Sequence, residues 1–137
     1  MGLILDSSVF IAGERCGETV RQIISRVWTA HGNVECTLSV ITALELTHGI
    51  YRARSDADRI RRRAFTDEVF RTMIVHPVSL PIAQLAGRIE GEQAALGVSV
   101  AFQDLIIGTT ALHLGFGVVT LNVRHFKAIP GLSVESL

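Results

Sequence analysis

The chain has 137 residues, of which 48% are apolar, and its 13 basic side chains balance its 13 acidic ones. This composition suits one packed domain, residues 1–137, and excludes disorder and nucleic-acid binding by bulk charge. No apolar run reaches the roughly 18 residues that span a bilayer, and no basic region precedes the first apolar stretch. We therefore expect a soluble, cytoplasmic protein without a signal peptide.

The first half of the chain alternates short apolar runs with longer amphipathic stretches. Its expected elements are strands at 2–5 and 34–39 and helices at 7–13, 17–30, 39–53 and 56–73. Ser7 or Ser8 can cap the helix at 7–13, and Gly13 can stop it. The helix at 39–53 can be capped by Ser39 or Thr42. In the helix at 56–73, the predicted inner stripe is Ile60, Ala64, Val69, Phe70 and Met73.

The second half continues the alternation. Its expected elements are strands at 74–78, 117–122 and 131–137 and helices at 80–96 and 103–114. The inner face predicted for the helix at 80–96 is Ile82, Leu85, Ala86, Ile89 and Leu96. Alternating strands and helices indicate a three-layer α/β/α sandwich around a mainly parallel sheet. In such sheets ligands bind at the carboxyl ends of the strands, and Asp6 stands where the first strand ends.

Three carboxylates lie in segments too apolar for ordinary surface charges: Asp6, Glu45 and Asp104. Each has a structural alternative. Asp6 can cap the following helix, Glu45 can close a capping box with Thr42, and Asp104 can favour the positive end of its helix. None of these alternatives explains why all three acids are embedded in apolar segments near predicted strand ends and helix starts.

Carboxylates gathered in a partly buried cleft repel one another, and a hard divalent cation removes that cost. Mg²⁺ or Mn²⁺ prefers oxygen ligands and can activate water and stabilise a phosphate undergoing transfer. Asn122 follows a strand that can lie beside the first, where its amide oxygen can join the site. Thr120 can support an acidic ligand through a hydrogen bond. The pattern indicates a metal-dependent nuclease or phosphoesterase.

Nearly half of the basic residues fall within twelve positions: Arg52, Arg54, Arg59, Arg61, Arg62 and Arg63. A solvated helix face is one explanation of this segment. A surface that contacts RNA phosphates or a partner protein is the other.

Successive motifs of the PIN-domain ribonucleases resemble three stretches of the chain, LDSSVFIA, SVITALELTHGI and FQDLIIGTTALHLGFGVVTLNVRHFKAIPGLSV. The most similar members are the VapC-type toxins of bacterial toxin–antitoxin modules. The last stretch is the most specific, because an acid opens an apolar helix before Gly-x-Gly-x-Val-Thr, Thr-x-Asn-x-x-x-Phe and Ile-Pro-Gly-Leu. The resemblance covers essentially the whole chain and implies a PIN-like fold.

The resemblance also implies roles for individual residues. Asp6, Glu45 and Asp104 match the three principal acids around Mg²⁺ or Mn²⁺, Asn122 matches an additional site position, and Ser8 matches a supporting hydroxyl. Relatives cut RNA, often tRNA or ribosomal RNA, form homodimers, and are held inactive by an antitoxin whose tail packs in a groove. His125 departs from the pattern, since many relatives carry Asp there, and a second metal ion is then in doubt.

The hypothesis that follows is a type II toxin that hydrolyses RNA. Asp6 and Asp104 bind the cation directly, Glu45 binds it through water or positions the attacking water, and Asn122 helps to orient that water. A catalytically weak PIN-like module that binds RNA or an antitoxin is the alternative, because of Asn122 and His125. A phosphoryl-transfer domain with Asp6 as nucleophile is a weaker rival, since Ser8 stands where a second Asp is needed.

Overall fold

Five parallel strands form the centre of the molecule in this computed structural model, which describes residues 1–137. The strands are β1 (Gly2–Leu5), β2 (Glu35–Ser39), β3 (Val75–His76), β4 (Gly117–Thr120) and β5 (Val134–Ser136), in the order β3-β2-β1-β4-β5. The central strand β1 pairs with β2 and β4, so that Ile4 lies opposite Thr37 on one side and Val118 on the other. The predicted parallel sheet is confirmed, and no strand is antiparallel.

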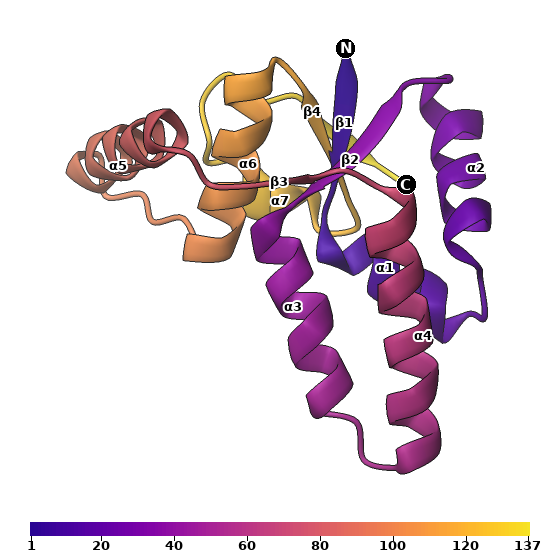
Figure 1. The fold of residues 1–137 in the computed structure, drawn as a ribbon. Helices are drawn as coiled ribbons and strands as arrows, with labels where there is room; N and C mark the ends of the chain where they lie inside the picture. Colours follow the sequence, from indigo (N-terminus) through magenta and orange to yellow (C-terminus); the bar gives the residue numbers. More distant parts are fainter.

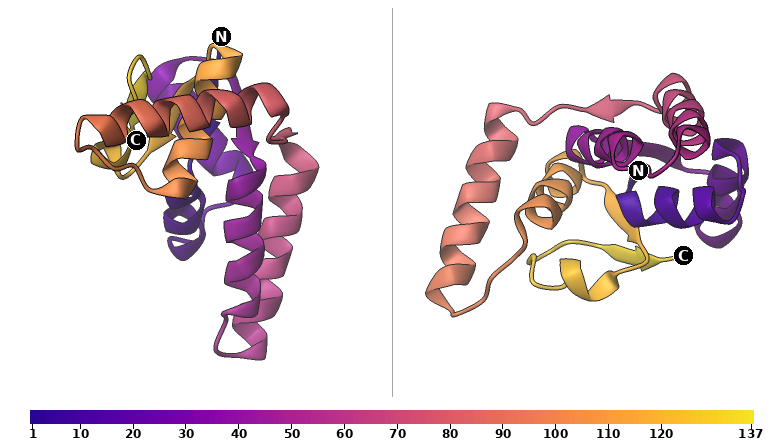
Figure 2. Two further views of the ribbon diagram at one scale, coloured as in Figure 1. Left: turned by 90° about the vertical axis from the view of Figure 1, so that its left-hand side faces the viewer. Right: turned by 90° about the horizontal axis from the view of Figure 1, so that it is seen from below.

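Seven helices surround this sheet. They are α1 (Ser7–Arg15), α2 (Val20–His31), α3 (Val40–Tyr51), α4 (Asp56–Thr72), α5 (Leu80–Ala95), α6 (Phe102–Leu114) and α7 (Val123–Phe126). Figures 1 and 2 show α1, α2 and α4 on one side of the sheet and α5, α6 and α7 on the other. The three-layer α/β/α sandwich is therefore confirmed, with α7 as a short helix that the sequence did not predict. No helix combines the length and the apolar character needed to cross a membrane.

Alternate residues of the central strand point to opposite faces of the sheet and belong to two separate apolar cores. Leu3 and Leu5 of β1 pack with side chains of α1, α2 and α4, whereas Ile4 packs with side chains of α5, α6 and α7. This period of two is what a strand covered on both faces requires. The sheet is therefore held between two apolar layers, and its carboxyl edge stays open for polar groups.

The start of α1 differs from the prediction. Asp6, not Ser7 or Ser8, occupies the N-cap position, and no side chain caps the helix. Gly13 does not stop the helix, which continues to Arg15. Gly13 instead lies where α1 contacts Ile23 of α2, so closely that an added Cβ would collide with that side chain. The glycine thus serves a close helix–helix contact and not a helix end.

The inner stripe predicted for α4 is only partly right. Val69 and Met73 are buried, but Ile60 is 70% exposed and Phe70 is 39% exposed. The buried side of the helix instead includes Thr66. For Ile60 the physical reason is visible in Figure 1: α3 and α4 run together beyond the edge of the sheet as a hairpin, and the first half of α4 has no sheet to cover it.

The inner face predicted for α5 fails at one residue. Ile82, Ala86 and Ile89 are buried as expected, but Leu96 is 75% exposed. The helix ends at Ala95, and Gly97 turns the chain with a positive φ of 77°. Leu96 therefore lies in the turn and not on the helix face.

Candidate active site

Asp6 is fixed at the carboxyl end of the central strand. Its backbone N–H donates to the Val119 carbonyl at 2.9 Å, which extends the β1–β4 pairing by one residue. Its side chain is only 5% exposed, and Oδ2 accepts hydrogen bonds from Ser8 Oγ and Thr120 Oγ1, both at 2.8 Å. The other oxygen, Oδ1, makes no hydrogen bond within the protein. Because the side chain makes no cap bond to α1, capping does not account for this carboxylate.

The two hydroxyls that hold Asp6 are themselves held by the backbone that follows β4. Ser8 Oγ accepts from the N–H of Leu121 at 3.1 Å, and Thr120 Oγ1 accepts from the N–H of Asn122 at 2.9 Å. Each hydroxyl therefore accepts one hydrogen bond and donates another to the carboxylate. This network ties the β4–α7 turn to Asp6 and fixes the orientation of its side chain.

Glu45 approaches the same region from α3. That helix begins with Ser39 as its cap, whose hydroxyl accepts from the N–H of Ile41 at 3.1 Å. Thr42 therefore lies inside the helix, and the capping box with Glu45 does not form. Instead, Glu45 Oε2 accepts a hydrogen bond from Ser7 Oγ at 3.0 Å.

Burial raises the pKa of Glu45 above its ordinary value. The hydrogen bond from Ser7 opposes this rise, and the negative charges of Asp6 and Asp104 add to it. Glu45 thus responds electrostatically to both of the other acids, although 39 and 59 positions separate the three along the chain.

Asp104 lies in the first turn of α6, with 17% of its side chain exposed. Burial and the nearby charge of Asp6 raise its pKa, and His125 acts in the opposite direction. His125 Nδ1 lies 3.6 Å from Asp104 Oδ2. The helix start favours an acid at this position, but a helix start alone does not explain the raised pKa or the approach to Asp6.

Asn122 stands at the start of α7, where its side chain makes no cap bond. It is exposed and lines a shallow pocket of about 290 Å³ together with Leu121, Val123, Arg124 and His125. Its backbone is joined to Thr120, and through Thr120 to Asp6. The backbone of Asn122 is therefore tied to Asp6 through Thr120, and its amide side chain is exposed.

Sequence reasoning missed two contacts in this region. Ser7 donates to Glu45, and His125 approaches Asp104. The only sequence signal for the first was that a second hydroxyl follows Asp6 in LDSS. The position of His125 in the last motif was recognised as unusual, but its partner depends on how α6 and α7 pack.

A second cavity, of about 170 Å³, opens beside Glu45 between α1, α3 and α4. Apolar side chains such as Phe10, Leu46 and Phe65 form part of its wall, and Glu14 and Arg62 add charge. The three acids and this cavity therefore share one side chain, Glu45.

The donor set fits a hard divalent cation. It consists of three carboxylates, of which Asp6 and Asp104 raise the pKa of Glu45 and Asp6 raises the pKa of Asp104, and no lysine or arginine forms an ion pair with any of them. The structure contains no group of three His, Cys, Asp or Glu side chains already spaced to enclose an ion directly. Mg²⁺ commonly keeps several waters and uses only one or two carboxylates, so this spacing is compatible with it.

The fold and this arrangement of acids define the class of protein. The model of the PIN domain matches residues 3–132, and the chain therefore belongs to the PIN-domain family, as its motifs predicted. Ribonuclease VapC1 of Rickettsia felis is 31% identical over 98% of this chain and 95% of its own length. Ribonuclease VapC of Rickettsia bellii is 29% identical over the same shares.

Solved structures agree with this assignment. VapBC2 from Rickettsia felis, bound to a DNA fragment from their promoter, has a TM-score of 0.85 at 19% identity and covers 100% of this chain and 99% of its own. DNA-bound VapBC from Salmonella typhimurium has a TM-score of 0.83 at 25% identity, with coverage of 99% and 98%. The predicted similarity to VapC-type members of the PIN family is confirmed.

Proposed function

We propose that the protein is a metal-dependent endoribonuclease and the toxin of a toxin–antitoxin pair. The relatives in the Rickettsia species are named as ribonucleases, and the similar structures are VapBC complexes. The observation that supports catalysis most directly is that Glu45 and Asp104 are partly buried and that the charge of Asp6 acts on both, so that burial and this charge raise the pKa of each acid. Such repulsion, kept in a half-buried cleft, is typical of functional sites.

Asp6, Asp104 and Glu45 are the proposed ligands of the cation, and Mg²⁺ is the proposed ion, with Mn²⁺ as a substitute. PIN-domain ribonucleases are in general metal-dependent. When bound, the cation supplies Lewis-acid chemistry, since it makes water more acidic and offsets negative charge on the phosphate. The hydroxyls of Ser8 and Thr120 keep Asp6 in one orientation for this purpose.

The remaining steps belong to side chains of this protein. Glu45 has a raised pKa, which suits a general base that takes a proton from the attacking water. Ser7 holds its carboxylate at one oxygen and leaves the other available. Asn122 donates from its amide to the water or to a phosphate oxygen, without adding negative charge near the RNA.

The proposed partners are an RNA substrate, with tRNA or ribosomal RNA as candidates, a cognate antitoxin, and a second copy of the chain in a homodimer. The cavity between α1, α3 and α4 is the proposed seat of the antitoxin tail, because a basic side chain entering it meets Glu45 and Glu14. We also place the protein in the cytoplasm, where these RNAs are found.

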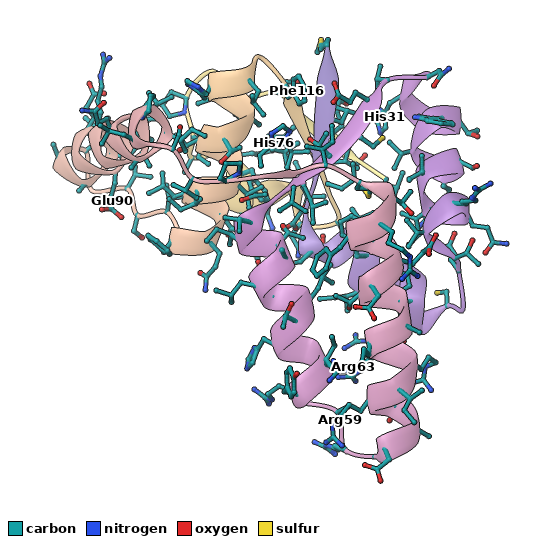
Figure 3. The ribbon with its side chains drawn as sticks, viewed as in Figure 1. His31, Arg59, Arg63, His76, Glu90 and Phe116 are labelled. Carbon is teal, nitrogen blue, oxygen red and sulfur yellow. The ribbon has the colours of Figure 1, made fainter.

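Cleavage of labelled RNA in Mg²⁺ by purified protein tests the proposal, with EDTA added to a parallel sample. Asp6→Asn and Asp104→Asn should each lower the rate at least 100-fold, roughly the effect of losing several kcal/mol of transition-state stabilisation. Glu90→Gln is the matched control, because it removes an exposed carboxylate on α5, a helix that carries none of the proposed site residues (Figure 3). Wild-type rates in either aspartate variant would refute the assignment.

The binding-only alternative makes a different prediction. A catalytically weak module would bind Mn²⁺ or RNA in calorimetry but would produce no cleavage that EDTA abolishes. Sequencing the RNA ends that appear after induced expression then identifies the target of the active enzyme.

A further inference from the structure

The arginine segment of residues 52–63 divides into two sets in the folded protein. Three arginines make ion pairs or hydrogen bonds to acids or carbonyl groups of the folded chain. Arg59 pairs with Asp56 at 2.9 Å and donates to the Ala53 carbonyl, and Arg61 pairs with Asp58 at 2.7 Å. Arg61 also reaches Glu14 of α1 at 3.2 Å, and Arg62 donates to the Gly49 carbonyl at 2.7 Å. These three are therefore accounted for by the fold.

Of the other three, two have no partner within the protein, and one contacts only an exposed tyrosine. Arg52 and Arg54 are exposed, and neither side chain makes a hydrogen bond or an ion pair. Arg63 lies with its guanidinium carbon 5.5 Å from the centre of the Tyr51 ring and donates to the Tyr51 hydroxyl at 3.2 Å. Tyr51 itself is 64% exposed. Figure 3 shows Arg63 and Arg59 near the far end of the hairpin, away from the sheet.

This end of the hairpin is linked to the acids by one helix. Glu45 and Arg52 are seven residues apart on α3 and its C-cap, which places them on the same side of the helix. At 1.5 Å per residue the separation along the axis is about 10 Å. A single strand of RNA crosses that distance in very few nucleotides.

The acidic site and the far end of the α3–α4 hairpin carry opposite charge. The segment 52–63 holds six arginines and two aspartates, so in a neutral chain the remaining residues carry four more acids than bases. The three acids of the site repel a polyanion, whereas phosphates are attracted to the far end of the hairpin. The substrate of the proposed nuclease therefore needs a basic holding surface outside the site, and the free arginines offer one.

We propose that Arg52, Arg54, Arg63 and Tyr51 form a binding surface for the single-stranded part of the RNA substrate, adjacent to the acids. This inference rests on the proposed function. Arg52 and Arg54 contact phosphates through their forked N–H groups, and the Tyr51 ring, steadied by Arg63, stacks on a base. Free guanidinium groups beside an exposed aromatic ring are the combination with which proteins hold single strands without reading their sequence.

Fluorescence anisotropy with a labelled, unstructured oligoribonucleotide of about 20 nucleotides, longer than a typical site of 4–16 nucleotides, tests the surface. EDTA prevents cleavage, so the measurement reports binding alone. Arg52→Gln with Arg54→Gln should raise Kd about tenfold at 0.1 M salt and reduce the log–log salt slope by about 1.4, the value for two phosphate contacts to a single strand. The control pair, Arg71→Gln with Arg88→Gln, removes the same charge from exposed sites on α4 and α5 and should leave Kd unchanged.

Two further variants separate stacking from charge. Tyr51→Ala should raise Kd about tenfold, as loss of one stacked base predicts, whereas Tyr51→Phe keeps the ring and should bind as the wild type does. Equal Kd values and salt slopes for wild type and the Arg52/Arg54 variant would overturn the proposal. Loss of antitoxin binding with unchanged RNA binding would overturn it too, and would assign the surface to a protein partner.

The results that would refute the proposed nuclease function differ from those that would refute the binding surface. Asp6→Asn should abolish cleavage without weakening RNA binding in the anisotropy assay, since Asp6 lies outside the hairpin and its charge repels the strand. If that variant still cleaved RNA, the catalytic assignment would fall while the binding result stood. Conversely, the Arg52/Arg54 variant should cleave a very short oligonucleotide, unable to reach the hairpin end, at the wild-type rate.

Discussion

Thr120 donates a hydrogen bond of 2.8 Å to Asp6 Oδ2, although 114 positions separate the two residues. The contact exists because Asp6 directly follows β1, Thr120 ends β4, and the two parallel strands are neighbours. Thr120 is fully buried, and its hydroxyl also accepts from the N–H of Asn122. One side chain thus sets the position of a carboxylate and of the turn that carries Asn122.

Thr120→Val tests this relationship with almost no change of shape. We expect the rate of RNA cleavage to fall about 10- to 100-fold, the usual cost of removing a group that orients a metal ligand. The free energy of unfolding should fall as well, by roughly 1–3 kcal/mol, because the Asn122 N–H loses its acceptor. Thr120→Ser keeps the hydroxyl and should retain most of the activity. Equal activity in the Val and Ser variants would show that the hydrogen bond has no catalytic role.

The raised pKa values of Glu45 and Asp104 predict how stability depends on pH. The folded state holds these protons more tightly than the unfolded state, so protonation of the two carboxyls stabilises the fold. Their stabilising contribution is complete below the ordinary values of 4.5 and 3.8 and is lost as the pH rises through the higher folded values. In metal-free protein, Glu45→Gln with Asp104→Asn should therefore melt above the wild type at pH 7.5, and the difference should vanish toward pH 4.

Addition of Mg²⁺ should reverse the order of the two melting temperatures, so that the wild type melts above the double variant. The proposed Mg²⁺ site exists only in the folded state, so the cation should raise the Tm of the wild type at pH 7.5 by mass action. It should not raise the Tm of the double variant, in which two of the proposed ligands are neutral. Differential scanning fluorimetry across a Mg²⁺ titration measures both effects. A Tm for the double variant that rises in parallel with the wild type would place the ion elsewhere.

The sequence predicted those features of the fold that depend on one short segment at a time. Runs such as GLIL are buried on both faces and could be recognised as strands, and the alternation with helices then required a parallel sheet. Because strand ends of such a sheet share an edge, the location of Asp6 followed from the fold class. Its proximity to Thr120 required in addition that β4 lie beside β1, which the structure shows.

The rest depended on tertiary packing. Ser7 and Ser8 are good helix caps by composition, but their hydroxyls are drawn to Glu45 and Asp6, which no local pattern reveals. Ile60 has the spacing of an inner residue, yet the hairpin leaves it in solvent. The arginine segment could not be divided into free and engaged side chains, since Arg61 and Arg62 find partners on α1 and α3.

His125 offers a test of how charge in the site sets metal affinity. Its Nδ1 lies 3.6 Å from Asp104 Oδ2. His125→Asp adds a carboxylate near the other acids, so the metal-free protein should lose stability through repulsion. Its affinity for Mn²⁺ should increase about tenfold, because ligand charge governs binding of hard cations. Isothermal titration calorimetry measures the affinity, and neutral His125→Asn is the matched control, in which no increase is expected.

Two helix-interior glycines should respond to alanine in opposite directions. At Gly13 of α1, a Cβ would overlap Ile23 Cδ1 and lie 2.7 Å from Cγ1 of the same buried side chain. We expect Gly13→Ala to destabilise the fold by about 1–3 kcal/mol, the usual cost of overpacking a core. At Gly87 of α5 nothing lies within 4 Å of the added carbon, so the better helix propensity of alanine should stabilise by up to about 1 kcal/mol. Urea unfolding gives both values, and a stabilised Gly13→Ala protein would contradict the close α1–α2 contact.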